Sequence, residues 1–167
     1  MFERINILFI CKNHFKTLYS LDGNGNGKVN LTELFVFYIG AVVLSSIMVF
    51  VFDIYITEEA ANLLVQAFAV VGGFLINARF LLIDKQSHFD DSRKYTDIKT
   101  LIEETSHNTS FGVLVCFFNV LLSVGVILAQ DVCVIYQILS VCVLSLTFIF
   151  CHVLLMIVRR LESILDT

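Results

Sequence analysis

Four long stretches of this sequence contain no Asp, Glu, Lys or Arg residue, and they limit what the chain can fold into. A helix of about 20 residues crosses the roughly 30 Å hydrocarbon core of a bilayer, and a helix that is apolar on every side has no face suited to water. The sequence therefore predicts an all-α integral membrane protein with four transmembrane helices, joined as two hairpins. The predicted spans are residues 34–52, 60–78, 111–129 and 132–158.

The positive charges of the chain predict how these spans are oriented. All eleven Lys and Arg residues lie before the first span, between the second and third, or after the fourth, and the two hairpin loops carry only acidic charges. Because cytoplasmic loops of membrane proteins are enriched in Lys and Arg, we expect both termini to be cytoplasmic. The four-span bundle would cover residues 34–158, and the cytoplasmic parts would be residues 1–33, 79–110 and 159–167.

Residues 1–21 have the pattern of an N-terminal amphipathic helix. Apolar residues recur at helical spacing, and Arg4, Lys12 and Lys16 lie outside the apolar stripe. Such a helix can lie on the inner surface of the membrane or pack against a neighbouring subunit, and the sequence leaves both open. The stripe consists of Phe2, Ile5, Leu8, Phe9, Phe15 and Leu18.

The segment Asp22–Glu33, D-G-N-G-N-G-K-V-N-L-T-E, resembles the calcium-binding loop of EF-hand proteins position by position. Gly27 stands at the glycine position of that loop, and Phe15–Leu21 is similar to a shortened incoming helix. The resemblance implies calcium as a ligand. The ligands that it implies are Asp22, Asn24, Asn26, Lys28 through its carbonyl oxygen, and Glu33.

Two interpretations of this loop stay open. It can be a cytoplasmic calcium sensor that leads directly into the first span, or a turn that closes without metal, because Asn-Gly pairs favour tight turns. Only two of the implied ligands are carboxylates, which lowers the expected calcium affinity. EF-hand loops generally work in pairs, so a lone loop would have to pair with its copy in an oligomer.

Polar side chains inside the predicted spans are costly where they face lipid. We therefore expect them to face the bundle or an interface between copies, where they hydrogen-bond between helices or line a pore. The pairs Ala69–Gly73 and Gly125–Ala129 indicate close helix contacts. The intramembrane polar residues are Gln66, Asn77, Asn119, Gln137 and His152.

The segment 79–110 is the largest predicted soluble part. A short helix ending near Thr105 has an apolar face too small to form its own core, so this face must pack on the bundle, on another copy or on a partner. Acidic and basic residues balance in the segment, which argues against nucleic-acid binding. We expect a cytoplasmic protein partner to bind at Lys85, Arg93, Lys94, Ile98, Leu101 and Ile102.

No arrangement of residues indicates catalysis. His88, Asp90 and Asp91 lack a second histidine at ligand spacing, and the adjacent Cys151 and His152 point about 100° apart on a helix. The sequence thus predicts a non-enzymatic sensor or anchor subunit in the lipid bilayer, which forms homo-oligomers and holds a cytoplasmic partner. The alternative is an oligomeric ion channel, gated by calcium through the EF-hand-like loop.

The number and orientation of the spans resemble the four-span membrane subunit of the bacterial Kiwa antiphage system. This resemblance implies a place in the bacterial inner membrane, a separate cytoplasmic effector as partner, and a role in antiviral defence.

Overall fold

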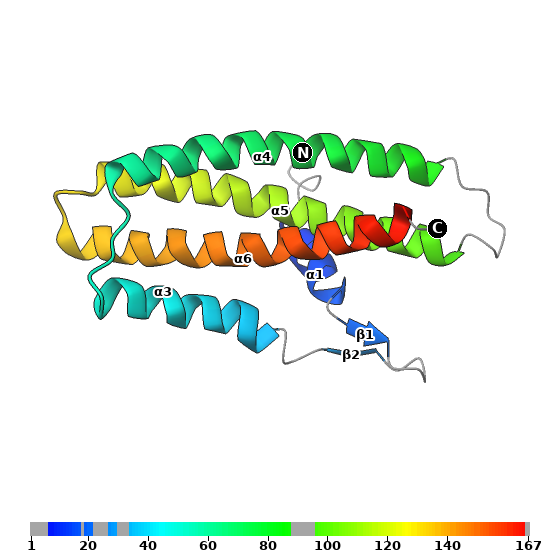
Figure 1. Ribbon diagram of the computed structural model, residues 1–167, viewed down its shortest axis with the longest axis horizontal. Helices are drawn as coiled ribbons and strands as arrows, with labels where there is room; N and C mark the ends of the chain where they lie inside the picture. Colours follow the sequence, from blue (N-terminus) through cyan, green and yellow to red (C-terminus); the bar gives the residue numbers. More distant parts are fainter. Residues whose placement is uncertain (1–6, 18, 22–26, 30–33, 88–95, 166–167) are drawn as a thin grey trace.

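The computed structural model describes residues 7–17, 19–21, 27–29, 34–87 and 96–165 (Figure 1). Apart from a short hairpin near the N-terminus, the regular structure in these ranges is helical. The elements follow in the order α1 (Ile7–Thr17), β1 (Tyr19–Leu21), β2 (Gly27–Val29), η2 (Leu34–Ile39), α3 (Gly40–Phe50), α4 (Glu58–Ser87), α5 (Thr96–Leu128) and α6 (Cys133–Leu165). The element η2 is a π-helix that continues directly into α3.

Three helices are long and apolar enough to cross a membrane, in the ranges Glu58–Gln86, Ile98–Leu128 and Cys133–Glu162. The prediction of a helical membrane protein is confirmed at this level. The first predicted span forms the shorter apolar helix Phe35–Phe50. At ~1.5 Å per residue this helix is about 24 Å long, which is less than the roughly 30 Å of hydrocarbon core.

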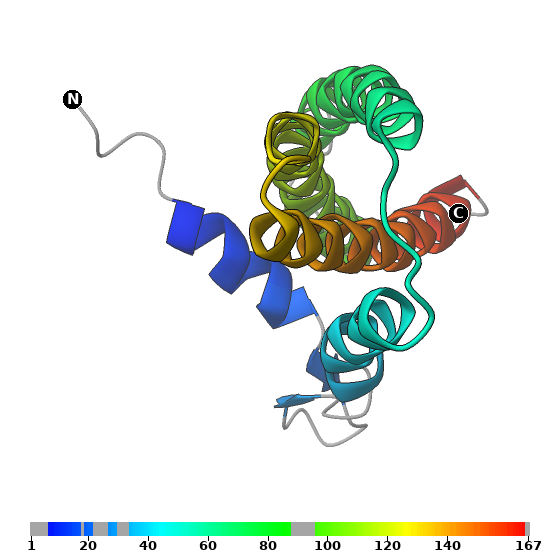
Figure 2. The ribbon, with the colours of Figure 1, turned by 90° about the vertical axis from the view of Figure 1, so that its left-hand side faces the viewer.

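The long helices α4, α5 and α6 pack together, and α3 packs on the outer side of α6 (Figure 2). Both hairpin loops lie at one end of the bundle, and the C-terminal ends of α4 and α6 lie at the other (Figure 1). The hydroxyl of Tyr136 donates a hydrogen bond to the carbonyl of Ile56 over 2.8 Å, which ties the first hairpin loop to the start of α6. The start of α4 is capped by Thr57, whose Oγ1 accepts a hydrogen bond from the Ala60 amide at 3.3 Å.

The main core lies between α4, α5 and α6. Phe68 of α4 and Phe150 of α6 meet edge to face, with ring centroids 5.1 Å apart, and Val115 of α5 is buried beside them. Close approach of α4 to α5 depends on Gly112, because a Cβ atom there would lie 3.1 Å from Cδ1 of Leu75. The small residue therefore sets the distance between these two helices.

The segment 79–110, predicted as a cytoplasmic loop, is largely helical. Helix α4 continues to Ser87 and α5 begins at Thr96, so both helices run well past the predicted ends of their spans. The apolar face of the segment packs on the bundle itself. Ile102 is fully buried against Leu82.

This packing corrects part of the predicted partner surface. Ile98 and Leu101 are half-buried beside the cluster that contains Ile102, so Ile102 is not available to a partner. Lys85 stays exposed on α4, whereas Arg93 and Lys94 lie outside the described residues.

The predicted incoming helix of the EF-hand-like segment is also wrong in part. Helix α1 ends at Thr17, and Tyr19–Leu21 forms a strand that pairs antiparallel with Gly27–Val29. An EF-hand requires a helix that leads into its loop. Here a hairpin takes the place of the last part of that helix.

Candidate functional site at the junction of α1, α5 and α6

Helix α1 lies crosswise to the bundle and extends away from it beside α5 (Figure 2). The side of α1 that contacts the bundle includes polar residues: Asn13, His14 and Thr17 are buried, and Ile10 is partly buried against the core. The open surface of α1 carries the exposed Lys12 and Lys16 together with large apolar residues, with Leu8 80% exposed and Phe9 58% exposed. A helix packed on a protein in water would bury more of its apolar surface.

His14 is the centre of the contact between α1 and α5. Its Nδ1 lies 2.8 Å from Oδ1 of Asn108, and its Nε2 is hydrogen-bonded to the hydroxyl of Tyr38. Because Oδ1 of Asn108 can only accept, Nδ1 of His14 carries the proton and Nε2 accepts from Tyr38. The ring also stacks on Phe111, with centroids 3.9 Å apart and planes 3° from parallel.

Helix α6 holds the end of α1 through Arg160. The guanidinium Nη2 donates to the carbonyl oxygen of Thr17 at 3.0 Å and pairs with Oε2 of Glu104 at 3.3 Å. Thr17 Oγ1 lies 2.7 Å from Oδ1 of Asn108. These contacts join the last turn of α1 to both α5 and α6, although the three segments are far apart in the sequence.

Burial lowers the pKa of His14 from 6.5 to about 4. The hydrogen bond with Asn108 opposes this effect, and electrostatic interactions with His152 and Arg160 on α6 lower the pKa further. The ring is therefore neutral at physiological pH. Because it is completely buried, it has no access to a substrate and holds structure rather than performing acid–base chemistry.

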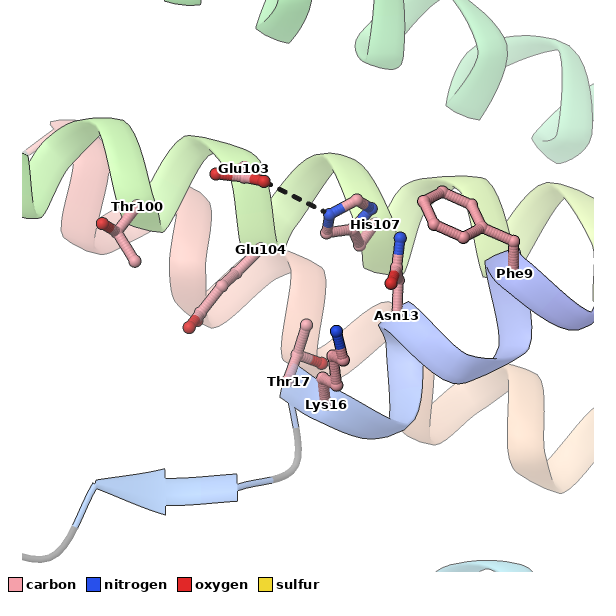
Figure 3. Close-up of a pocket in the computed structure, with 8 residues that line it drawn as sticks. All are labelled: Phe9, Asn13, Lys16, Thr17, Thr100, Glu103, Glu104 and His107. Atoms are coloured by element: carbon pink, nitrogen blue, oxygen red, sulfur yellow. Dashed lines mark ion pairs between the residues drawn. The ribbon is translucent and has the colours of Figure 1, made fainter. Parts of the chain in front are cut away.

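A polar cavity of about 410 Å³ lies beside this contact, between α1 and α5 (Figure 3). On its α5 side, Nε2 of His107 lies 3.7 Å from a carboxylate oxygen of Glu103. Lys16 contributes a positive charge from α1, so the lining carries charges of both signs. The lining residues are Phe9, Asn13, Lys16, Thr17, Thr100, Glu103, Glu104 and His107.

In the described part of the chain, no three His, Cys, Asp or Glu side chains gather as a metal site. The cavity is a recess at the root of α1 with charges of both signs in its lining.

The implied calcium ligands Asp22, Asn24, Asn26 and Glu33 lie outside the described residues. Lys28 is described as part of β2, where it pairs with Ser20 across the hairpin. The prediction of a calcium site thus concerns a segment of which the structure describes only residues 27–29, together with the strand that precedes it.

The structure separates the five predicted intramembrane polar residues into two groups. Asn119 is fully buried, with its Nδ2 3.2 Å from Oγ1 of Thr147. His152 stacks on Phe37, with centroids 3.8 Å apart. Gln137 lies at the hairpin end, where its Nε2 donates to the Tyr55 hydroxyl at 3.3 Å.

Gln66 and Asn77 form the second group and are exposed on α4. They face away from the core of the single chain, as a residue at an interface between copies would. The sequence indicated that these side chains need partners, but it did not indicate which of the five lie inside the bundle.

Sequence reasoning missed His14, Thr17 and Asn108. One signal was available: the polar run Thr105–Ser110 directly precedes an apolar span, which is unusual at a membrane boundary unless something polar covers it. The partner of this run, 94 residues away at His14, has no signature in a single sequence.

Comparison with known proteins does not assign the chain to a family: no family model matches it, and no curated protein or solved structure is significantly similar to it.

Proposed function

We propose that this protein is a non-enzymatic membrane anchor subunit, which associates with copies of itself through α4 and presents a cytoplasmic surface to a partner protein. The observation that carries the proposal is the exposed polar and small face of α4. Its members, Gln66, Ala69, Gly73 and Asn77, are all exposed. Their spacing of three or four residues places them on one side of the helix.

This face suits a second copy of the same helix. An amide side chain in hydrocarbon is costly without a hydrogen-bond partner, and the amides of Gln66 and Asn77 can both donate and accept. A Cβ atom at Gly73 would meet nothing within 4 Å, so this position is open to close approach. A copy related by symmetry would bring the same residues together, and each amide would then find a partner.

The charge distribution supports a cytoplasmic surface at the end opposite the hairpin loops. Helices α4 and α6 terminate at that end (Figure 1), and positively charged residues lie there before or after the predicted spans. They are Arg79, Lys85, Lys99, Arg159 and Arg160. The positive-inside rule assigns this end to the cytoplasm.

The position of α1 supports the same orientation. The helix lies crosswise to the bundle at the level of Phe111, with Leu8 and Phe9 exposed, as an interfacial helix on the inner leaflet would lie. In this arrangement α3 crosses the membrane in addition to α4, α5 and α6. Its short length is compensated by local thinning of the bilayer or by flanking residues that reach to the membrane surface. The partner surface then consists of α1, the cavity beside it and the projecting ends of α4 and α5.

Measuring the mass of the purified full-length protein in detergent tests self-association. We expect the wild-type chain to be oligomeric and a Gly73→Leu variant, or a Gln66→Leu/Asn77→Leu variant, to shift toward monomer. Phe74→Leu is the matched control, because Phe74 is exposed on the same helix but points about 100° away from Gly73. A monomeric wild-type protein, or variants with unchanged mass, would contradict the proposal.

An oligomeric channel is the second candidate, and the exposure of Gln66 and Asn77 supports it as well. If copies of α4 faced a shared axis, these amides would line the pore. Asn119, which is buried within one chain, would not. Ion flux into liposomes that Gln66→Leu abolishes would favour the channel, whereas a stoichiometric soluble protein that co-purifies without flux would favour the anchor.

A further inference from the structure

A groove runs between α4 and α5 on the side of the bundle next to α1. It has a volume of about 470 Å³, which is within the usual range of small-molecule sites, roughly 300–1,000 Å³. Ile10 of α1 closes one side. The residues used below are Ile76, Arg79 and Phe80 of α4 and Ser110, Val113 and Phe117 of α5.

The lining of this groove contains two polar residues, Arg79 and Ser110, and is otherwise apolar. Val113 and Phe117 continue the lining toward the hairpin loops, and Ile83 lies one turn beyond Arg79 on α4. Arg79 is exposed, and no residue in the described part of the chain forms an ion pair or hydrogen bond with its guanidinium. None of the described lining residues carries a carboxylate. The positive charge is therefore not neutralised within the groove.

The depth of these residues matches the layers of a bilayer. Ile76, Val113 and Phe117 lie within the predicted spans 60–78 and 111–129. Arg79 and Ser110 are the first residues beyond those spans, at the end where Lys and Arg collect. Arg79 and Ser110 would thus lie at the level of the headgroups, and the lining from Val113 to Phe117 would lie in the hydrocarbon, which matches the orientation of a phospholipid in that leaflet.

We infer that this groove binds a phospholipid with an anionic headgroup. Its phosphate contacts the guanidinium of Arg79, and one acyl chain lies along Val113 and Phe117. The guanidinium suits a phosphate, because it offers several donors in a plane and stays charged. A net negative headgroup is favoured over a zwitterionic one, since the described lining carries no carboxylate to pair with a positively charged headgroup. The inference rests on the membrane orientation proposed above, but not on self-association.

Lipid retention by the purified full-length protein tests this site. The protein in mild detergent is incubated with equal amounts of phosphatidylglycerol and phosphatidylcholine, and the bound lipid is counted by native mass spectrometry. We expect preferential retention of phosphatidylglycerol by the wild-type protein and about tenfold weaker retention by Arg79→Gln, since a charge-assisted contact is lost. Arg79→Lys should keep part of the preference.

Lys85→Gln is the matched control. It removes the same charge from an exposed position on the same helix outside the groove, so it should retain phosphatidylglycerol like the wild type. Equal retention of both lipids by the wild type, or an equal loss in Arg79→Gln and Lys85→Gln, would overturn the site and leave only general contact with lipid. The mass of the same samples is read in parallel, and a monomer that still prefers phosphatidylglycerol would support the groove while contradicting self-association.

Discussion

His14 is a neutral histidine buried in a contact that a charged ring would weaken. Its pKa in the folded protein is about 4, below the ordinary value of 6.5. The contact is therefore at full strength above pH 6.5, weakens as the pH falls toward 4, and weakens no further below that value. The total loss is about 3 kcal/mol. We predict that a spin label at position 8 in a cysteine-free background becomes more mobile as the pH is lowered from 7.5 to 4.5.

The control for this prediction removes the titrating ring. In a His14→Asn variant the label at Leu8 should show a mobility that does not change over the same pH range. A variant that loosens with falling pH as the wild type does would show that another group, such as His152 or Arg160 with its partner Glu104, is responsible. The hydroxyl of Tyr38 also faces the ring. A Tyr38→Phe variant removes this hydroxyl but keeps the titrating His14, so the label should still become more mobile as the pH falls.

A larger side chain at Gly112 tests how tightly α4 and α5 are packed. Its added Cβ would lie 3.1 Å from Leu75 and 3.7 Å from Cγ1 of Val153. We predict that Gly112→Val lowers the free energy of unfolding by about 1–3 kcal/mol, because a well-packed core resists added volume. Gly125→Ala is the comparison, since its Cβ would have ordinary contact with Leu139 at 3.5 Å, and it should be near neutral. Unfolding experiments in mixed micelles give the free energy of unfolding of both variants. An equal loss of free energy in Gly112→Val and Gly125→Ala would contradict this difference in packing.

At the level of single residues, the sequence predicted which side chains need partners and did not predict where those partners lie. Asn119 and Gln66 have the same kind of surroundings in the sequence, yet one is buried and the other exposed. Helices that are apolar on every side give no contrast between an inner and an outer face. Which face is turned inward is therefore decided by packing, as at Gly112 against Leu75.

Among the elements, the hairpin β1–β2 changes what is expected of the calcium loop. Because a strand precedes Asp22 in place of a helix, we propose calcium binding weaker than that of a sensor hand, with a Kd above about 10 μM. Calorimetric titration of the purified protein should show binding that an Asp22→Ala/Glu33→Gln variant loses. A Kd below about 10 μM would contradict this prediction. A titration that shows no heat of binding up to millimolar calcium would contradict any calcium site.

The boundaries of the elements were harder to predict than their existence. The apolar runs predicted every long helix, but the spans 60–78 and 111–129 cover only part of α4 and α5, which continue to Ser87 and begin at Thr96. In the structure α5 includes its polar stretch because Thr109 Oγ1 donates to the carbonyl of Thr105 at 2.8 Å and Ser110 Oγ to Ser106 at 2.7 Å. These bonds satisfy the hydroxyls within the helix, and α1 covers its surface.

For the whole molecule, the orientation in the membrane is the prediction with the widest consequence. Cys133 is exposed next to the second hairpin loop, and Lys85 is exposed at the opposite end. We predict that a membrane-impermeant maleimide added to intact cells labels Cys133. A Lys85→Cys variant in a Cys133→Ser background should be labelled only after the cells are opened. The opposite pattern would invert the topology, and labelling of both from outside would exclude the bundle as a spanning unit.

The sequence did not predict how the helices are arranged around one another. Charge and run length predicted hairpins, and α4, α5 and α6 do pack together, but α3 packs on the outer side of α6 (Figure 2). The contact of α1 with the bundle could not be predicted either, because it depends on His14, Asn108 and Arg160 meeting across long separations in the chain.

The last of these contacts sets an order of events during synthesis. Helix α1 is fixed by a residue made much later: the bond from Arg160 to Thr17 spans 143 positions. Until α6 has been produced, the last turn of α1 lacks the hydrogen bond from Arg160 and is held only through the contacts of α1 with α5 and Tyr38. A nascent chain stopped before Arg160 should therefore leave α1 more open to protease, and addition of the rest of α6 should protect it.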